Sequence, residues 1–184
     1  MNNNSVMRLT VSGLLIAVGI VIPMFSPLKI VMEPASFTLA SHVAIFVAMF
    51  ISPGAAAIVA AGTTVGFFLG GFPIVIVLRA ASHVAFATLG ALYLHRTREE
   101  NLSAAKLRVF SFFVASIHAI GELAVVSAFY FSGDIGELFY QQGFIMSVLL
   151  LVGLGTVIHS MVDFEIANAI RLVLRKQLMA LKVS

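Results

Sequence analysis

The chain has 184 residues, of which 60% are hydrophobic and only 10% are charged. A soluble domain has about 45–50% apolar and about 25% charged residues. The mean hydropathy of +1.07 agrees with this contrast, so the composition excludes a soluble domain and predicts an integral membrane protein. The chain contains no cysteine, which excludes disulfides and thiol chemistry. The net charge of +3 is small, and we expect no nucleic-acid partner.

Long apolar segments recur along the chain between proline, glycine or charged residues. A spanning helix needs roughly 20 mostly apolar residues, so the length has room for about six. We predict an all-α fold, a single domain covering residues 1–184 with six transmembrane helices. The first apolar run is too long for a signal peptide and is predicted to be retained. The predicted spans are residues 9–24, 37–51, 55–69, 74–94, 109–131 and 144–170.

Prolines and glycines mark the predicted ends of several spans. Pro23 and Pro27 are expected to end the first helix, because proline lacks a backbone donor and clashes with the preceding turn. Residues 25–36 are predicted to form a loop, and residues 52–54 to break the chain between the second and third spans.

Basic residues concentrate on one side of this six-span arrangement. Cytoplasmic loops carry an excess of Lys and Arg, so we predict that both termini are cytoplasmic, in a multi-pass protein of the cell membrane. Only Lys29 is expected on the outer side, with Glu33, Asp134 and Glu137. The basic residues assigned to the cytoplasmic side are Arg8, Arg96, Arg98, Lys106, Arg108, Arg171, Arg175, Lys176 and Lys182.

Ionisable residues within the predicted spans are the candidates for function, because a charge in the membrane is costly. Arg79 and His83 are four residues apart and share a helix face, as do His118 and Glu122. At 1.5 Å per residue, Arg79 lies about 8 Å and Glu122 about 14 Å below the outer surface. An Arg–Glu pair flanked by imidazoles can bind a small polar ring, or it can be a structural ion pair between two helices.

Four further residues are predicted near the same outer level. His42 lies near the start of the second span, and it can either contact a ligand or lie in an interfacial loop. The aromatic side chains of Phe37, Phe72 and Tyr130 can stack on a flat ligand, although membrane interfaces also collect aromatic residues.

His159 and Asp163 are predicted to lie apart from this group. Counted from residue 144, they are roughly 23–29 Å down, which places them at the cytoplasmic interface as a structural polar pair. No HExxH motif or comparable ligand spacing is present, so we predict no metal site and no cofactor. No GxxxxGK[ST] phosphate loop occurs either, so any ATP hydrolysis must come from another chain.

The first span carries Gly13 and Ala17 at a four-residue spacing. Small residues at this spacing allow helices to approach closely in lipid, either within the bundle or against a partner.

Taken together, the chain resembles the substrate-binding S component of an energy-coupling factor (ECF) vitamin transporter. The stretches that carry the resemblance are LTVSGLLIAVGIVIPMF (residues 9–25), EPASFTLASHVAIFVAMFISPGAA (33–56) and GFFLGGFPIVIVLRAASHVAFATLGALYL (66–94).

The resemblance implies capture of a water-soluble vitamin from outside, and docking on a transmembrane T component driven by two cytoplasmic ATPases. It implies that Gly13 and Ala17 lie on the docking face, where the family has alanine at both positions, so that Gly13 is a departure. It also implies that the first outer loop, with Lys29, Glu33 and Ser36, closes over the site.

The ligands expected from the resemblance are hydroxymethylpyrimidine, pyridoxine or niacin. A carboxylate such as niacin favours Arg79, whereas a neutral hydroxylated ring favours Glu122 and the histidines as partners. Two other functions stay open, a self-sufficient secondary transporter or channel and an intramembrane enzyme. The enzyme is the weakest of the three, because no nucleophile accompanies His118 and Glu122.

Overall fold

A computed structural model describes residues 3–32, 35–98 and 102–183 of the chain. Its elements are mainly helical, with one short β-hairpin near the N-terminus. In chain order they are α1 (Asn3–Phe25), β1 (Lys29–Met32), β2 (Ala35–Thr38), α2 (Val43–Ile51), α3 (Pro53–Leu69), α4 (Ile74–Thr97), α5 (Ala104–Ser132), α6 (Glu137–Gln141), the π-helix η2 (Ile145–Leu154) and α7 (Gly155–Val183).

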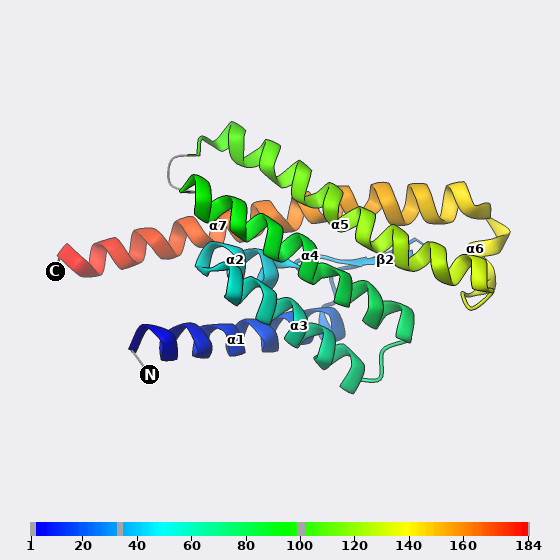
Figure 1. Cartoon of the computed structure of the whole chain (residues 1–184), viewed down its shortest axis with the longest axis horizontal. Helices are drawn as coiled ribbons and strands as arrows, with labels where there is room; N and C mark the ends of the chain where they lie inside the picture. The colour runs from blue at the N-terminus through cyan, green and yellow to red at the C-terminus, as the bar shows by residue number, and fades with distance from the viewer. Residues whose placement is uncertain (1–2, 33–34, 99–101, 184) are drawn as a thin grey trace.

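The long helices form one elongated bundle (Figure 1). The start of α1, the end of α4, the start of α5 and the end of α7 lie at the same end of this bundle, on the left of the view. At the opposite end, α5 and η2 extend further than α4 does. The shared end is the one to which the sequence assigned the cytoplasmic basic residues, and the inward orientation of both termini stays a prediction.

The all-α prediction is confirmed, whereas the count of six spans is not. Within the described part of the chain, four segments are long and apolar enough to cross a membrane, judged by length and composition. They are Ser5–Phe25, Ile74–Thr97, Ala104–Ser132 and Ile145–Leu174. The remaining apolar helices have 17 residues in α3 and nine in α2. At 1.5 Å per residue they reach about 26 Å and about 14 Å, less than the hydrocarbon thickness of about 30 Å.

The second predicted span is the largest departure. Its predicted start, Phe37, lies in β2, and α2 begins only at Val43. The carboxylate of Asp163 in α7 accepts hydrogen bonds from the backbone N–H groups of Ala40 and His42, at 2.8 and 2.9 Å. The carboxylate thus accepts two backbone donors of the turn before α2, where a longer helix would have used backbone carbonyls. Asp163 lies more than 120 residues away from this turn in the sequence.

The predicted loop after the first span is partly a β-hairpin. Strands β1 and β2 pair antiparallel, with Lys29 opposite Thr38 and Val31 opposite Ser36. The preceding helix ends at Phe25, one residue later than predicted, so Pro23 lies inside its last turn and does not end it. Helical hydrogen bonding continues past the proline, since the N–H of Ser26 donates to the carbonyl of Ile22 at 2.9 Å.

The break between α2 and α3 follows the prediction. Ser52 is the N-cap of α3 and its hydroxyl accepts a hydrogen bond from the N–H of Ala55 at 3.0 Å. Pro53 occupies the first turn, where its missing N–H costs nothing.

The apolar core lies between α2, α3, α4, α5 and α7. Phe46, Phe86 and Phe164 are almost fully buried there, and Phe46 contacts Phe86 at a tilt and Phe164 edge to face. His83 and His118 lie against the ring of Phe86, at centroid distances of 5.6 and 4.4 Å. The core therefore ends directly at a buried cluster of polar side chains.

Candidate ligand-binding site

A cavity of about 170 Å³ lies between the β-hairpin and helices α1, α3, α4, α5 and α7. Its polar lining includes Arg79, His83 and Glu122, the group predicted from the sequence. The other lining residues are Pro23, Phe37, Thr38, Ser41, His42, Thr63, Phe67, Phe72, Ile76, Ala80, Thr156 and His159.

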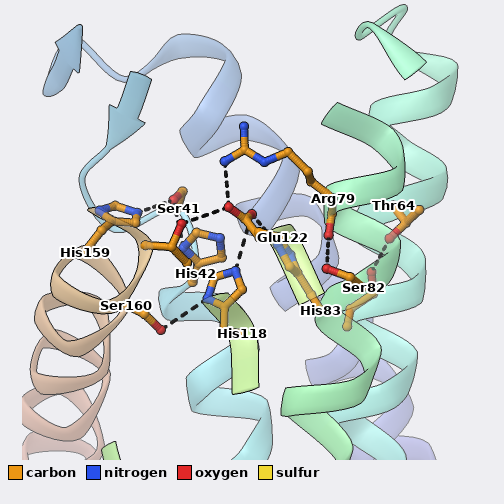
Figure 2. Close-up of polar contacts among 12 residues, drawn as sticks. Ser41, His42, Thr64, Arg79, Ser82, His83, His118, Glu122, His159 and Ser160 are labelled. Atoms are coloured by element: carbon orange, nitrogen blue, oxygen red, sulfur yellow. Dashed lines mark hydrogen bonds and ion pairs between the residues drawn. The ribbon is translucent and has the colours of Figure 1, made fainter. Parts of the chain in front are cut away.

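The predicted Arg79–Glu122 pair is formed. Arg79 Nη2 donates to Glu122 Oε2 at 2.7 Å, and the hydroxyl of Thr156 donates to the same oxygen at 2.9 Å (Figure 2). The Glu122 side chain is 4% exposed and that of Arg79 is 21% exposed. Glu122 is therefore fixed in the interior, while the guanidinium extends from it into the cavity.

Imidazole rings surround the other oxygen of Glu122. His83 Nε2 is 3.3 Å and His118 Nε2 is 3.5 Å from Glu122 Oε1. The ring of His42 packs edge to face against both histidines, at centroid distances of 4.9 and 4.7 Å. The structure thus brings His42, His83, His118 and Glu122 together from three different parts of the chain.

His159 and Asp163 belong to this cluster, so their predicted place at the cytoplasmic interface is wrong. His159 Nε2 lies 3.0 Å from Ser41 Oγ, and Asp163 Oδ2 lies 3.2 Å from His42 Nδ1. The depth was overestimated because it was counted from residue 144 as if that residue lay at the outer surface. The η2 end of this long apolar segment projects beyond the start of α4 (Figure 1), and His159 lines the cavity.

Aromatic rings form the apolar part of the cavity wall. Phe67 and Phe72 stack at a centroid distance of 4.6 Å, and Phe37 packs against His159 at 5.5 Å. A Cβ added to Gly155 would lie 2.6 Å from the Phe37 ring, so the absence of a side chain at Gly155 makes room for Phe37.

No family model matches the sequence, and no solved structure matches it. A protein described as the niacin transporter NiaX, from Lactococcus lactis subsp. cremoris (strain MG1363), is 42% identical over 172 residues. The match covers 93% of this chain and 76% of the relative. This chain belongs to the NiaX family of niacin transporters. It is therefore a transmembrane protein of vitamin uptake, which confirms that part of the resemblance seen in the sequence.

In this NiaX-family chain, only some of the site residues predicted from the sequence reach the cavity. Those that line it are Phe37, His42, Arg79, His83 and Glu122. His118 lies behind them, 1% exposed, with its Nδ1 3.2 Å from the hydroxyl of Ser160.

Tyr130 is not brought to the cavity. Its ring packs with Tyr140 and Phe144 at centroid distances of 4.7 and 5.3 Å, in a separate cluster around α6 and η2. The sequence placed it too near the ligand because α5 extends past the start of α4 (Figure 1), and Tyr130 lies in the last turn of α5.

The predicted lid residues are only partly described. Glu33 lies outside the described residues, and Lys29 and Ser36 are known here by their backbone pairing in the hairpin. Phe37 and Thr38 are the last two residues of the second strand, and both line the cavity. A lid role for this segment stays a prediction.

Several cavity residues were missed from the sequence. Ser41, Thr63 and Thr156 are small hydroxyl residues in apolar segments, and Phe67 resembles any other lipid-facing phenylalanine. The sequence signal that was available is the Ser41-His42 pair together with His159-x-x-x-Asp163, which are polar residues in otherwise apolar runs.

The predicted docking residues lie on an open face of α1. Gly13 and Ala17 are exposed, and a Cβ added to Gly13 would meet nothing within 4 Å. On the opposite face, Ser12 and Gly19 are buried against the bundle. In the NiaX-family chain described here, only one side of α1 is used for internal packing.

Proposed function

We propose that this protein is the niacin-capture subunit of an ATP-driven ECF importer in the cell membrane. The observation that carries the proposal is the Arg79 guanidinium, which is anchored on Glu122 and extends into a cavity of single-ring size. Niacin is a pyridine with one carboxylate, and it supplies both an anion for Arg79 and a flat ring for the cavity.

The guanidinium has donors to spare for a ligand carboxylate. It presents five N–H groups in a planar fork, which matches a carboxylate with two parallel hydrogen bonds. One of these N–H groups, on Nη2, donates to Glu122. The Nε of Arg79 is buried and has no hydrogen-bond partner in the described part of the chain. A buried donor without a partner costs free energy, so a ligand oxygen that satisfies it gains correspondingly.

The size of the cavity favours one aromatic ring. An engineered apolar cavity of about 150 Å³ holds benzene, and this cavity has about 170 Å³. Drug-sized ligands occupy roughly 300–1,000 Å³. A pyridine carboxylate therefore fits the available volume better than a vitamin with two fused rings.

The cavity walls offer a place for both faces of the ring and for its nitrogen. Phe37, Phe67 and Phe72 provide aromatic surfaces for stacking. The ring nitrogen of niacin is an acceptor, and the hydroxyl of Ser41 can donate to it.

Energy coupling through partner proteins is supported by two features. The sequence has no phosphate loop for ATP, and the α1 face with Gly13 and Ala17 is open. Only 11% of the α1 span is buried, against 44% of the α5 span. We assign this face to the transmembrane T component, with ATP hydrolysis by its two ATPase chains.

The test is thermal unfolding of the purified, tag-free protein in detergent with a panel of ligands. The panel contains niacin, nicotinamide, pyridoxine and hydroxymethylpyrimidine. A ligand with nanomolar Kd at micromolar concentration adds about 4 kcal/mol to the stability of the folded state. We expect niacin to give the largest rise in unfolding temperature, and Arg79→Ala to reduce that rise.

A folded protein that responds to none of the four ligands would contradict niacin capture. Coupling is tested separately, by niacin uptake into liposomes that contain the protein alone or together with a T component and its ATPases. ATP-dependent uptake only in the complete assembly is expected, whereas uptake by the protein alone would favour the self-sufficient transporter.

A further inference from the structure

We propose that the buried cluster of His42, His83, His118 and Glu122 binds one divalent transition-metal ion of the zinc class. The group shares His42, His83 and Glu122 with the lining of the proposed niacin cavity. Metal content and niacin binding are measured separately, so each proposal can fail without the other. The sequence predicted no metal site because the ligands are not close along the chain.

The four side chains meet the geometric demand of a small metal ion. Each offers one ligand atom, and the four atoms lie within 4.8 Å of one another. In a tetrahedral site with metal–ligand bonds of 2.0–2.1 Å, neighbouring ligand atoms are about 3.4 Å apart. The distances from Glu122 Oε1 to His83 Nε2 and His118 Nε2 are 3.3 and 3.5 Å.

Two of the three histidine rings are already oriented by hydrogen bonds from their other nitrogens. Asp163 Oδ2 is 3.2 Å from His42 Nδ1, and Ser160 Oγ is 3.2 Å from His118 Nδ1. Both contacts leave Nε2 as the nitrogen that remains for the cluster. Metal-binding histidines usually carry such a partner, often a carboxylate, because it sets the tautomer and the ring orientation.

One ligand atom in the cluster is unsatisfied. His118 Nε2 is fully buried and has no hydrogen-bond partner among the described residues. A buried imidazole nitrogen without a partner is costly. A metal ion that accepts its lone pair removes this cost.

The charges of the cluster favour a cation as well. Glu122 and Asp163 are two buried carboxylates, and Arg79 is the one permanently charged cation in contact with them among the described residues. With neutral imidazoles the cluster keeps one negative charge. Glu122 shares its oxygens, since Oε2 faces Arg79 and Oε1 faces the histidines, so it can hold both cations at once.

The ligand set indicates the class of metal. Imidazole nitrogen suits zinc, copper and nickel, while carboxylate, carbonyl and water oxygens suit calcium and magnesium. Three nitrogens and one oxygen in a site without thiolates therefore favour zinc-class ions over magnesium or calcium.

The test uses the tag-free protein in detergent, stripped with a chelator and then dialysed against Zn²⁺ or Co²⁺. After removal of unbound ions we expect one metal ion per chain by elemental analysis, and the visible absorption of tetrahedral Co²⁺. Less than one-tenth of an ion per chain would overturn the proposal.

Variants locate the ion. His118→Ala should lower the bound metal at least tenfold, whereas His159→Ala, in the neighbouring group with Asp163, should retain it. His95→Ala is the control for adventitious binding, because His95 is exposed near the end of α4. Equal retention in His118→Ala and wild type would overturn the assignment.

Loss of folding in His118→Ala is recognised by size exclusion, and His118→Gln then takes its place. A metal-dependent rise in the unfolding temperature of wild type and His159→Ala, reversed by chelator and absent in the His118 variant, is the expected second result. Niacin binding measured on the stripped protein tests the capture proposal by itself, so that failure of one proposal is distinguishable from failure of the other.

Discussion

The exposed face of α1 and the buried cluster between α4 and α5 differ in the residues that they contain and in how tightly these residues are packed. The α1 face carries the small residues Gly13 and Ala17, and a Cβ added to Gly13 would meet nothing within 4 Å in the described chain. The cluster holds Arg79 and Glu122 at 2.7 Å in the interior, where their mutual contact compensates the cost of burial. The difference teaches that the proposed docking face and the proposed ligand site lie on separate parts of this protein.

This separation makes a strong prediction, because damage to one region should spare the other. Changes in the cluster should alter ligand binding and stability. Changes on the α1 face should alter complex formation alone.

The largest effect is expected for Glu122→Ala. Removing one partner of a buried ion pair leaves the other charge uncompensated and costs about 3–5 kcal/mol. Niacin binding should be lost together with this stability, as measured by unfolding in detergent and by calorimetry. Glu165→Ala is the matched control, because Glu165 is 51% exposed and its contact with Arg108 is 3.8 Å long. Equal effects of the two substitutions would contradict a central role for Glu122.

A tryptophan on the α1 face should remove complex formation. Ala17→Trp fills the space into which a T component is proposed to pack, so co-purification with the module should fall at least tenfold while niacin binding stays unchanged. Phe113→Trp on the exposed side of α5 is the control. Loss of niacin binding in Ala17→Trp would show instead that this face belongs to the core of the bundle.

The Arg79 side chain should determine the preference for an acid. Hydrogen bonds to charged groups contribute about 1.5–3 kcal/mol, so Arg79→Ala should weaken niacin binding by about 10–150-fold. Arg79→Lys keeps the charge but loses the planar fork, and an intermediate effect is expected. Calorimetry with both variants measures the effect, and unchanged affinity in Arg79→Ala would make the ion pair purely structural.

A smaller effect is expected at the cavity wall. Gly155→Ala places a Cβ against the Phe37 ring, and such overpacking costs about 1–3 kcal/mol, shared between stability and the shape of the cavity. Niacin affinity should fall several-fold. Gly136→Ala is the control, because a Cβ there meets nothing within 4 Å. The same affinity in both variants would mean that Phe37 does not contact the ligand.

The smallest effect is expected at Tyr130. Since its ring packs with Tyr140 and Phe144 away from the cavity, Tyr130→Leu, which removes the aromatic face, should leave the niacin affinity of the folded protein within about twofold. A large loss would restore the ligand contact predicted from the sequence.

The sequence was sufficient for the parts of the site that depend on local spacing. Arg79 and His83, and likewise His118 and Glu122, are four residues apart on helices long enough to be recognised, so each pair could be placed on one face. Their meeting across α4 and α5 followed from similar estimated depths.

The sequence was not sufficient where long-range contacts decide. The turn before α2 is held by hydrogen bonds to Asp163 from α7. No pattern within residues 37–51 shows that this distant carboxylate binds the backbone there, and that α2 therefore begins later than predicted. Depth counted along the last span failed for His159, because the helices do not end level with one another on the side of η2 (Figure 1). The spans around α2 and α3 were predicted from apolar content, which does not reveal where helical geometry begins.

Calorimetric titration of niacin and nicotinamide into the purified wild-type protein tests the central claim most directly. The two ligands share the pyridine ring and differ in the group that faces Arg79, a carboxylate or a neutral amide. We predict one niacin bound per chain, with nicotinamide at least tenfold weaker. Equal affinities, or no binding of niacin by the folded protein, would contradict capture of the vitamin by the Arg79–Glu122 pair.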